Sequence, residues 1–179
     1  MSLKILAFGG SNSRHSINKK LATFVARLFT NAEVNIVDLN DFEMPIFSVD
    51  RESQFPPEAL RFAELIDQAD LIVMSLAENN GSYSVAFKNI FDWVSRIPNR
   101  TVFNNKNILL LATSPGARGG MTVLETAQKR FPFNGGVIVG SMSLPSFQQN
   151  FKDEVGITNA EYLSQAQALV LQATKASLK

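Results

Sequence analysis

Short, unbroken apolar runs of strand length recur along this chain, and they alternate with longer segments in which apolar residues return every three or four positions. Strands that are apolar on both sides are typical of a parallel sheet covered by helices, and the longer segments have the spacing of helices that bury one face. The alternation predicts an α/β fold with a doubly wound parallel sheet of five strands. The expected strands are residues 3–8, 33–39, 70–76, 107–113 and 137–140.

Helical segments follow the strands, so residues 1–179 are predicted to form a single domain with three layers, αβα. The expected helices are residues 17–28, 57–68, 85–97, 120–130 and 159–177. Residues 40–57 and 143–156 show no period and are expected to be irregular loops. The expected strand order is 2-1-3-4-5, the flavodoxin-like order, which places a ligand beyond the carboxyl ends of strands 1, 3 and 4. The loops at those ends are residues 9–16, 77–83 and 114–120.

The first of these loops is small, rich in hydroxyl groups and directly followed by a predicted helix. A helix N-terminus with free N–H groups favours an anion. No Lys-Ser or Lys-Thr follows the glycines, and GxGxxG is absent, which excludes a nucleoside-triphosphate loop and a dinucleotide fingerprint. A phosphate monoester such as flavin mononucleotide (FMN) fits; alternatively, a serine only caps the helix. The predicted cofactor-binding residues of this loop are Ser11, Ser13, Ser16, Ile17 and Asn18.

The second and third loops are rich in residues that permit tight turns. Asn and Gly tolerate a left-handed backbone, and the N–H and C=O groups of the second loop match the polar edge of a flavin ring. The alternative is an ordinary turn with Ser82 or Ser84 as a helix cap. The third loop, with three glycines and one proline, is expected to lie flat against a planar ligand. The predicted cofactor-binding residues are Glu78, Asn79, Asn80, Gly81 and Ser82, followed by Ser114, Pro115, Gly116, Gly119 and Gly120.

The composition excludes several classes of protein. A net charge of +1 without a basic stripe argues against a nucleic-acid binder. No apolar run of about 18 residues exists, so we expect no membrane partner and a cytoplasmic location. Cysteine is absent and His15 is the only histidine, which leaves no thiolate nucleophile and no expected metal site. We expect His15 to be a solvent-exposed spacer; the alternative is that it approaches the ligand phosphate. The chemistry is expected to come from a cofactor or from Ser, Asp, Glu and Tyr.

Three motifs carry a family resemblance: GGSNSRHSIN, AENNGSYSVAFKNIFDWVSR and ATSPGARGG. With them the chain resembles the NAD(P)H-dependent FMN reductases of flavodoxin-like fold, from Lys4 to about Gly140. The resemblance implies three roles. The first motif would hold the FMN phosphate through Ser11, Ser16 and Asn18, the second would meet the isoalloxazine edge through Glu78, Asn80 and Ser82, and the third would close over the ring through Ser114, Pro115, Gly116 and Gly120.

The chain departs from the family pattern at several positions. Ser13 stands where the family has Arg, and Arg14 follows one place later. Ala77 and Asn79 replace a Pro and a Tyr, and Ser84-Val85 replaces Pro-Gly. These changes alter the stiffness of the second loop and remove an aromatic side chain from beside the flavin.

The implied function is that of an FMN-dependent oxidoreductase, in which hydride passes from NAD(P)H through flavin N5 to a quinone, an azo compound or a free flavin. No catalytic residue is predicted, because the cofactor carries the redox chemistry. Glu78 is expected to orient its loop by hydrogen bonding rather than to act as a base. The alternatives are a flavin-binding electron carrier, or a non-redox binding module that retains the fold.

The resemblance also implies a homodimer or homotetramer. Trp93 is expected at the edge of the apolar face of its helix, partly covered by a partner subunit. A helix packed on both sides within one chain is the alternative.

Overall fold

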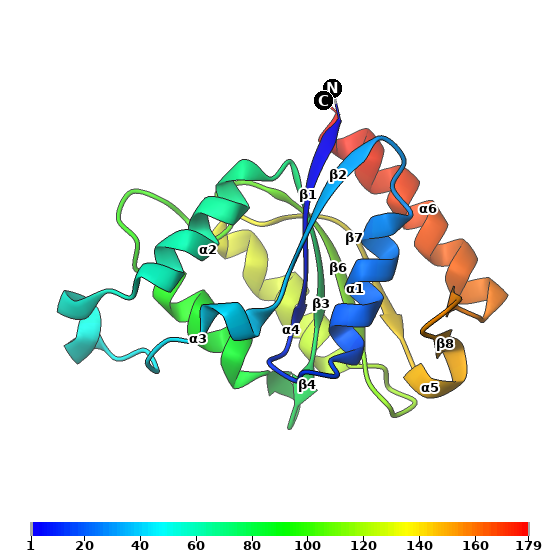
Figure 1. Cartoon of the computed structure of the whole chain (residues 1–179), viewed down its shortest axis with the longest axis horizontal. Coiled ribbons are helices and arrows are strands. Elements are labelled where there is room, and N and C mark those ends of the chain that lie inside the picture. The colour runs from blue at the N-terminus through cyan, green and yellow to red at the C-terminus, as the bar shows by residue number, and fades with distance from the viewer. Residues whose placement is uncertain (1, 179) are drawn as a thin grey trace.

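The computed structural model describes residues 2–178, and its centre is a parallel sheet of five strands in the order β2-β1-β3-β6-β7 (Figure 1). This is the predicted order 2-1-3-4-5, and the flavodoxin-like fold is confirmed. β3 is buried at every position, as expected for a strand covered on both faces. The strands are β1 (Leu3–Gly10), β2 (Ala32–Val37), β3 (Leu71–Leu76), β6 (Asn107–Thr113) and β7 (Val137–Leu144).

Helices cover both faces of the sheet, and each face has its own hydrophobic cluster (Figure 1). One face carries α1 (Ile17–Arg27) and α6 (Ala160–Ser177). The other carries α2 (Pro57–Gln68), α3 (Val85–Val94) and α4 (Met121–Arg130). The two clusters follow from the strands themselves, because successive side chains of a strand point to opposite sides of a sheet.

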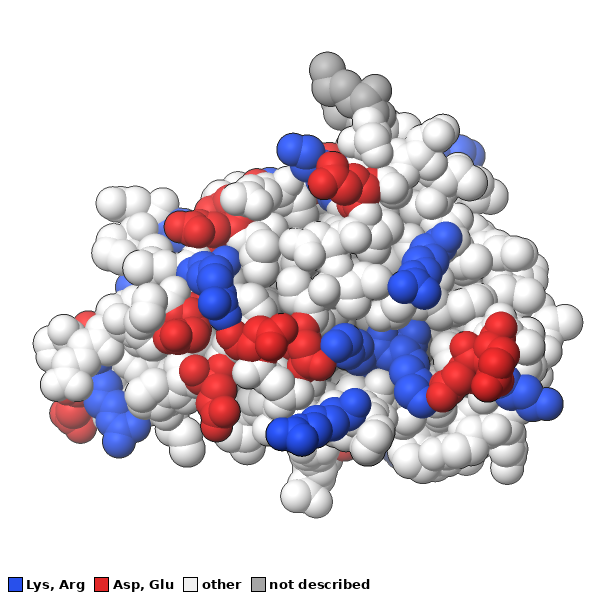
Figure 2. Space-filling view, in the orientation of Figure 1, with Lys and Arg blue, Asp and Glu red and all other residues white. Residues whose placement is uncertain are grey.

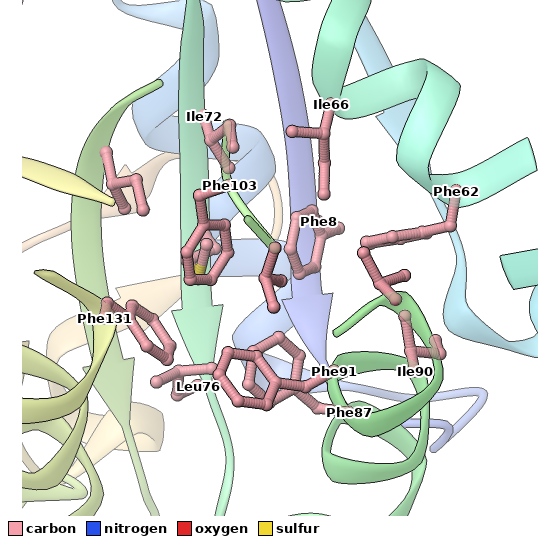
Figure 3. Close-up of a cluster of buried hydrophobic side chains, with 14 of the residues drawn as sticks. Phe8, Phe62, Ile66, Ile72, Leu76, Phe87, Ile90, Phe91, Phe103 and Phe131 are labelled. Carbon is pink, nitrogen blue, oxygen red and sulfur yellow. The ribbon is translucent and has the colours of Figure 1, made fainter. Parts of the chain in front are cut away.

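The cluster under α2, α3 and α4 is dominated by phenylalanine rings. Figure 3 shows Phe8 of β1, Phe62 of α2, Phe87 and Phe91 of α3, the loop residue Phe103, and Phe131 directly after α4 lying close together. Phe103 and Phe131 lie 4.7 Å apart between ring centroids, and Phe8 meets Phe62 edge-on at 5.3 Å. Such pairs add about 0.5–1.5 kcal/mol each beyond the burial of their area. This packing fixes α3 and α4 against the sheet, and both helices begin at the loops of the predicted site.

Trp93 is completely buried within this chain, at 0% exposure. Its ring packs edge-on against Phe47 and Phe55, with centroids 5.1 and 5.4 Å away, and its Nε1 donates to the Pro45 carbonyl at 2.7 Å. No indole surface is left for a partner subunit to cover, so that prediction is wrong. The alternative, a helix packed on both sides within one chain, is confirmed.

Several short elements occupy stretches that were expected to be irregular. The segment 40–57 contains the 3-10 helices η1 (Leu39–Phe42) and η2 (Val49–Gln54), each capped by a local side chain. β7 continues to Leu144, four residues beyond its expected end. Elements of two to six residues show no measurable period, which is why the sequence did not reveal them. The others are η3 (Phe131–Asn134), α5 (Phe147–Asn150), β8 (Phe151–Lys152) and β9 (Gly156–Ile157).

Candidate functional site

The carboxyl ends of β1, β3 and β6 are neighbours in the sheet, so the three loops that follow these strands meet there. They enclose a pocket of about 280 Å³, which we call the cofactor pocket. Its position is the one that the strand order predicts for a ligand. The lining residues are Ser11, Ser13, His15, Ser16, Ile17, Asn18, Ala77, Glu78, Asn79, Thr113, Ser114 and Pro115.

Each serine of the first loop uses its hydroxyl oxygen as an acceptor. Ser11 Oγ and Ser13 Oγ accept from the N–H groups two residues later, at 3.1 and 3.3 Å. Ser16 is the N-cap of α1, and its Oγ accepts from the Lys19 N–H at 3.1 Å, which confirms the capping interpretation. Because each oxygen accepts, each hydroxyl hydrogen is available to a further acceptor, and within residues 2–178 none of the three donates to a protein group. Capping and anion binding are therefore compatible.

Two backbone donors lie beside these hydroxyls. The N–H groups of Ile17 and Asn18 belong to the first turn of α1 and have no acceptor in the part of the chain that the structure describes. That turn contains no acidic side chain, and the positive end of the helix dipole lies there. The donor set of hydroxyls and free N–H groups fits a phosphate monoester, so these residues would hold the phosphate of FMN.

The Asn18 side chain is buried and fully engaged by the sheet. Its Nδ2 donates to the Thr113 carbonyl at 3.2 Å, while its Oδ1 accepts from the Thr113 N–H at 3.1 Å and from Ser75 Oγ at 2.7 Å. The amide thus joins the start of α1 to the ends of β3 and β6. The resemblance implies that the Asn18 side chain contacts the phosphate. Because this side chain is engaged by the sheet, only the backbone N–H of Asn18 is available for that contact.

The second loop forms a hairpin of β4 (Glu78–Asn79) and β5 (Ser82–Tyr83), where only a polar loop was expected. The turn residues Asn80 and Gly81 have φ values of 51° and 76°, the left-handed pair that a two-residue hairpin turn requires. The Asn-Gly pair was the available sequence signal for this hairpin. Glu78 and Asn79 line the cofactor pocket, whereas the tip of the hairpin lies outside its lining.

Glu78 connects the hairpin to α4. Its Oε2 accepts from the Val123 N–H, in the first turn of that helix, at 3.0 Å. The N-cap residue of α4 is Gly120, which has no side chain to fill this role. The carboxylate therefore caps a helix that begins 43 residues later, and the expectation that Glu78 orients its loop by hydrogen bonding is confirmed.

Two of the three glycines of the third loop serve close packing rather than contact with the pocket. Gly119 and Gly120 are buried and have φ values of 60° and 76°. A Cβ on Gly119 would lie 2.2 Å from Ser143 Oγ, which donates to the Gly119 carbonyl. Of this loop, Ser114 and Pro115 line the cofactor pocket.

The structure thus brings together nine of the predicted residues and leaves six outside the pocket lining. The six are Asn80, Gly81, Ser82, Gly116, Gly119 and Gly120. It adds three that were not predicted to bind: His15, Ala77 and Thr113. Thr113 could have been found, because it is the last residue of a predicted strand whose carboxyl end borders the site. His15 is exposed, as predicted, and it also lines the pocket; its approach to a ligand phosphate stays a prediction.

A second pocket, of about 300 Å³, adjoins the first and shares Asn79 with it. We call it the adjoining pocket; one of its walls comes from residues 39–46 and another from the start of α3. The wall is held by Asn89 on α3, whose Nδ2 donates to the carbonyls of Met44 and Pro45 and whose Oδ1 accepts from the Phe47 N–H at 2.8 Å. Trp93 also bonds to Pro45, so two residues of the FKNIFDW run, Asn89 and Trp93, hold this wall in place.

Two titratable side chains near the site have shifted pKa values. Burial raises the pKa of Tyr83 to about 12, although the positive charge of Arg130 opposes the shift. Burial also raises the pKa of Asp38, but hydrogen bonds from Lys19 and Asn40 outweigh it and hold that pKa below its ordinary value. Asp38 therefore stays ionised and paired with Lys19.

Neither a metal site nor a membrane span is found in residues 2–178. No three His, Asp or Glu side chains gather there closely enough to hold an ion. No helix in that range combines the length and apolarity needed to cross a bilayer.

The fold and the donor-lined pocket define a flavodoxin-like flavoprotein. The chain belongs to the NADPH-dependent FMN reductase family, whose sequence pattern matches residues 3–149. The family is one of oxidoreductases, and membership implies FMN as cofactor and NAD(P)H as reductant.

Similar proteins agree with this assignment. A 2-hydroxy-1,4-benzoquinone reductase of Burkholderia sp is 36% identical over 66% of this chain and 64% of its own length. A quinone reductase of Escherichia coli is 31% identical over 66% of this chain and 63% of its own. The matches thus cover just under two thirds of each relative. The structure of FerB, an NAD(P)H:(acceptor) oxidoreductase of Paracoccus denitrificans, aligns over 97% of this chain and 98% of that one, with a TM-score of 0.77 and 22% identity, which shows the shared fold.

Proposed function

We propose that this protein is an FMN-dependent NAD(P)H oxidoreductase whose electron acceptor is a small quinone. The observation that carries the proposal is the cofactor pocket, where three serine hydroxyls and two free backbone N–H groups can donate to one phosphate. The relatives named as quinone reductases support the acceptor class. Azo compounds and free flavins are the other acceptors to be tested.

FMN, when bound, would supply the redox chemistry by taking a hydride at N5 and passing electrons to the acceptor. The role of the protein residues is to bind and to orient the cofactor. The first loop holds the phosphate, and Glu78 fixes the hairpin beside it by its bond to α4. The adjoining pocket, which reaches the cofactor pocket at Asn79, has Phe42 and Met44 among its apolar lining residues, which suits an aromatic acceptor.

Steady-state kinetics test the proposal. NADPH oxidation is measured at several fixed concentrations of a benzoquinone, with FMN present. Parallel double-reciprocal lines are expected, because one cofactor pocket would serve reductant and acceptor in turn. Intersecting lines would contradict this scheme, and a lack of turnover with quinones, azo compounds and flavins alike would favour the binding module.

Ser16→Ala tests the phosphate site separately. It should weaken FMN by about 1–3 kcal/mol, the range for a hydrogen bond to a charged group, and leave riboflavin binding unchanged. Ser164→Ala is the matched control, because Ser164 is an exposed serine of α6 outside the pocket lining. Equal losses for FMN and riboflavin would place the phosphate elsewhere.

A flavin-binding electron carrier is the second candidate, favoured by one observation. Ile46 and Val85 line the adjoining pocket and are 67% and 68% exposed, so a partner protein could dock on them. We propose instead that they contribute to a homodimer or homotetramer, as the family resemblance implies. A cytoplasmic location, expected from the sequence, is also proposed. A chain that sediments as a monomer at micromolar concentration would favour the carrier.

A further inference from the structure

A groove runs along α1 outside the cofactor pocket, between this helix and β8. Its volume is about 410 Å³, larger than that of the cofactor pocket. The groove and the pocket share His15 and Ser16, so they meet at the loop proposed to hold the flavin phosphate. From Ser16 to Arg27 the helix rises by about 16 Å, which gives the groove the reach of an extended ligand.

The groove is basic although the chain as a whole is nearly neutral, at +1. Figure 2 shows basic side chains gathered over α1. One carboxylate, Asp153, lines the groove and pairs with Lys20 at 2.6 Å; Lys19 pairs with Asp38 at the same distance. The other two cations form no ion pair within residues 2–178. The four cations are Arg14, Lys19, Lys20 and Arg27.

Two aromatic rings add an apolar wall to this basic groove. Phe24 and Phe151 meet edge-on, with centroids 5.7 Å apart. Gly156 leaves space for the Phe24 ring: its φ is 88°, and a Cβ there would lie 1.9 Å from that ring. The glycine in the hairpin of β8 and β9 thus allows the Phe24 ring to lie in the groove.

We propose that this groove binds the adenosine phosphate part of a dinucleotide. Arginine matches the oxygens of a phosphate with paired N–H donors, and an aromatic wall suits a purine base. Two dinucleotides contain this group: FAD, whose adenylate continues from the flavin phosphate, and NADPH. Deciding between FAD and NADPH rests on the proposed reductase function. The proposal that the groove binds an adenosine phosphate does not rest on it.

Calorimetric titration of ADP into the FMN-loaded protein tests the groove directly. Arg27→Glu should weaken ADP about tenfold or more, the loss expected when a charge-assisted hydrogen bond is removed. Arg130→Glu is the matched control, because it makes the same charge change in the last turn of α4 that Arg27→Glu makes in the last turn of α1. Unchanged FMN affinity shows that each variant is folded. Absence of ADP binding, or equal losses in both variants, would overturn the proposal.

A second comparison tests the nucleoside class. Phe24→Leu should weaken ADP several-fold and leave inorganic pyrophosphate unaffected, since only the aromatic wall is changed. If pyrophosphate binds the original protein as tightly as ADP, the groove is a simple anion site and the nucleotide assignment fails.

Two further measurements on Arg27→Glu identify the dinucleotide. If Arg27→Glu weakens FAD but not FMN in the apoprotein, the adenylate of FAD occupies the groove. If it raises the KM for NADPH and leaves kcat unchanged, the adenosine of NADPH does. If it changes neither, the proposal fails even where ADP binds.

Discussion

Asn18→Ala should destabilise the fold at the point where the cofactor pocket is built. The Asn18 amide makes three hydrogen bonds to groups that are 0–1% exposed, Ser75 Oγ and the N–H and C=O of Thr113. Alanine leaves all three without this partner. A buried polar group that loses its partner costs about 1–3 kcal/mol.

The expected loss of stability in Asn18→Ala is smaller than three times the cost of one unpartnered group. Ser75 can rotate its hydroxyl toward another acceptor, and water can reach Thr113 from the cofactor pocket that it lines. We therefore expect the free energy of unfolding to fall by about 3 kcal/mol, a large share of the 5–15 kcal/mol typical of a domain.

Urea unfolding of the apoprotein measures this quantity. The midpoint should fall while the slope stays unchanged, because the same surface is exposed on unfolding. Asn12→Ala is the control, as Asn12 is an exposed asparagine of the same loop. A loss below about 0.5 kcal/mol, the range of ordinary surface substitutions, would refute the view that Asn18 joins α1 to the sheet.

Two further predictions concern the hairpin. Glu78→Ala should lower the free energy of unfolding by about 1–2 kcal/mol through loss of the α4 cap, whereas Glu78→Gln keeps an acceptor oxygen and should retain turnover; abolished turnover in Glu78→Gln would show that Glu78 acts as a base. Tyr83 has a buried hydroxyl without a partner in the described chain, so Tyr83→Phe should raise stability by about 1 kcal/mol at neutral pH, as urea unfolding would show. The folded pKa of Tyr83, about 12, lies above its ordinary value of 10.0, so the unfolded chain loses this proton first. The original protein should then lose stability between pH 10.0 and about 12 relative to Tyr83→Phe, and parallel pH profiles would contradict the shift.

The architecture could be predicted from the sequence because its signals are local. Strands buried on both faces appear as continuous apolar runs, and the helices between them carry their own period. Strand order and chain direction then place three loops at one edge of the sheet, so the sequence predicts that Ser11, Ser16 and Asn79 lie at one site, and all three line the cofactor pocket.

What each polar side chain does there was decided by the tertiary structure. Asn18 was identified by its place in a motif, but its amide bonds to Ser75 and Thr113, 57 and 95 residues away. Glu78 caps a helix that begins 43 residues later, and the Trp93 ring donates to a loop carbonyl 48 residues earlier. Partners this distant in sequence depend on how helices and loops pack on the sheet.

The groove along α1 shows the same division. Three of its four cations, Lys19, Lys20 and Arg27, lie on α1, but they form no stripe that the sequence alone reveals. Phe151 and the glycine that leaves space for Phe24 come from a short hairpin with no readable period. The sequence by itself determined the sheet, its order and the edge where the cofactor pocket lies. The tertiary structure decided which side chains face a ligand and which hold the frame, because hydrogen-bonding groups are satisfied by neighbours in space rather than in sequence.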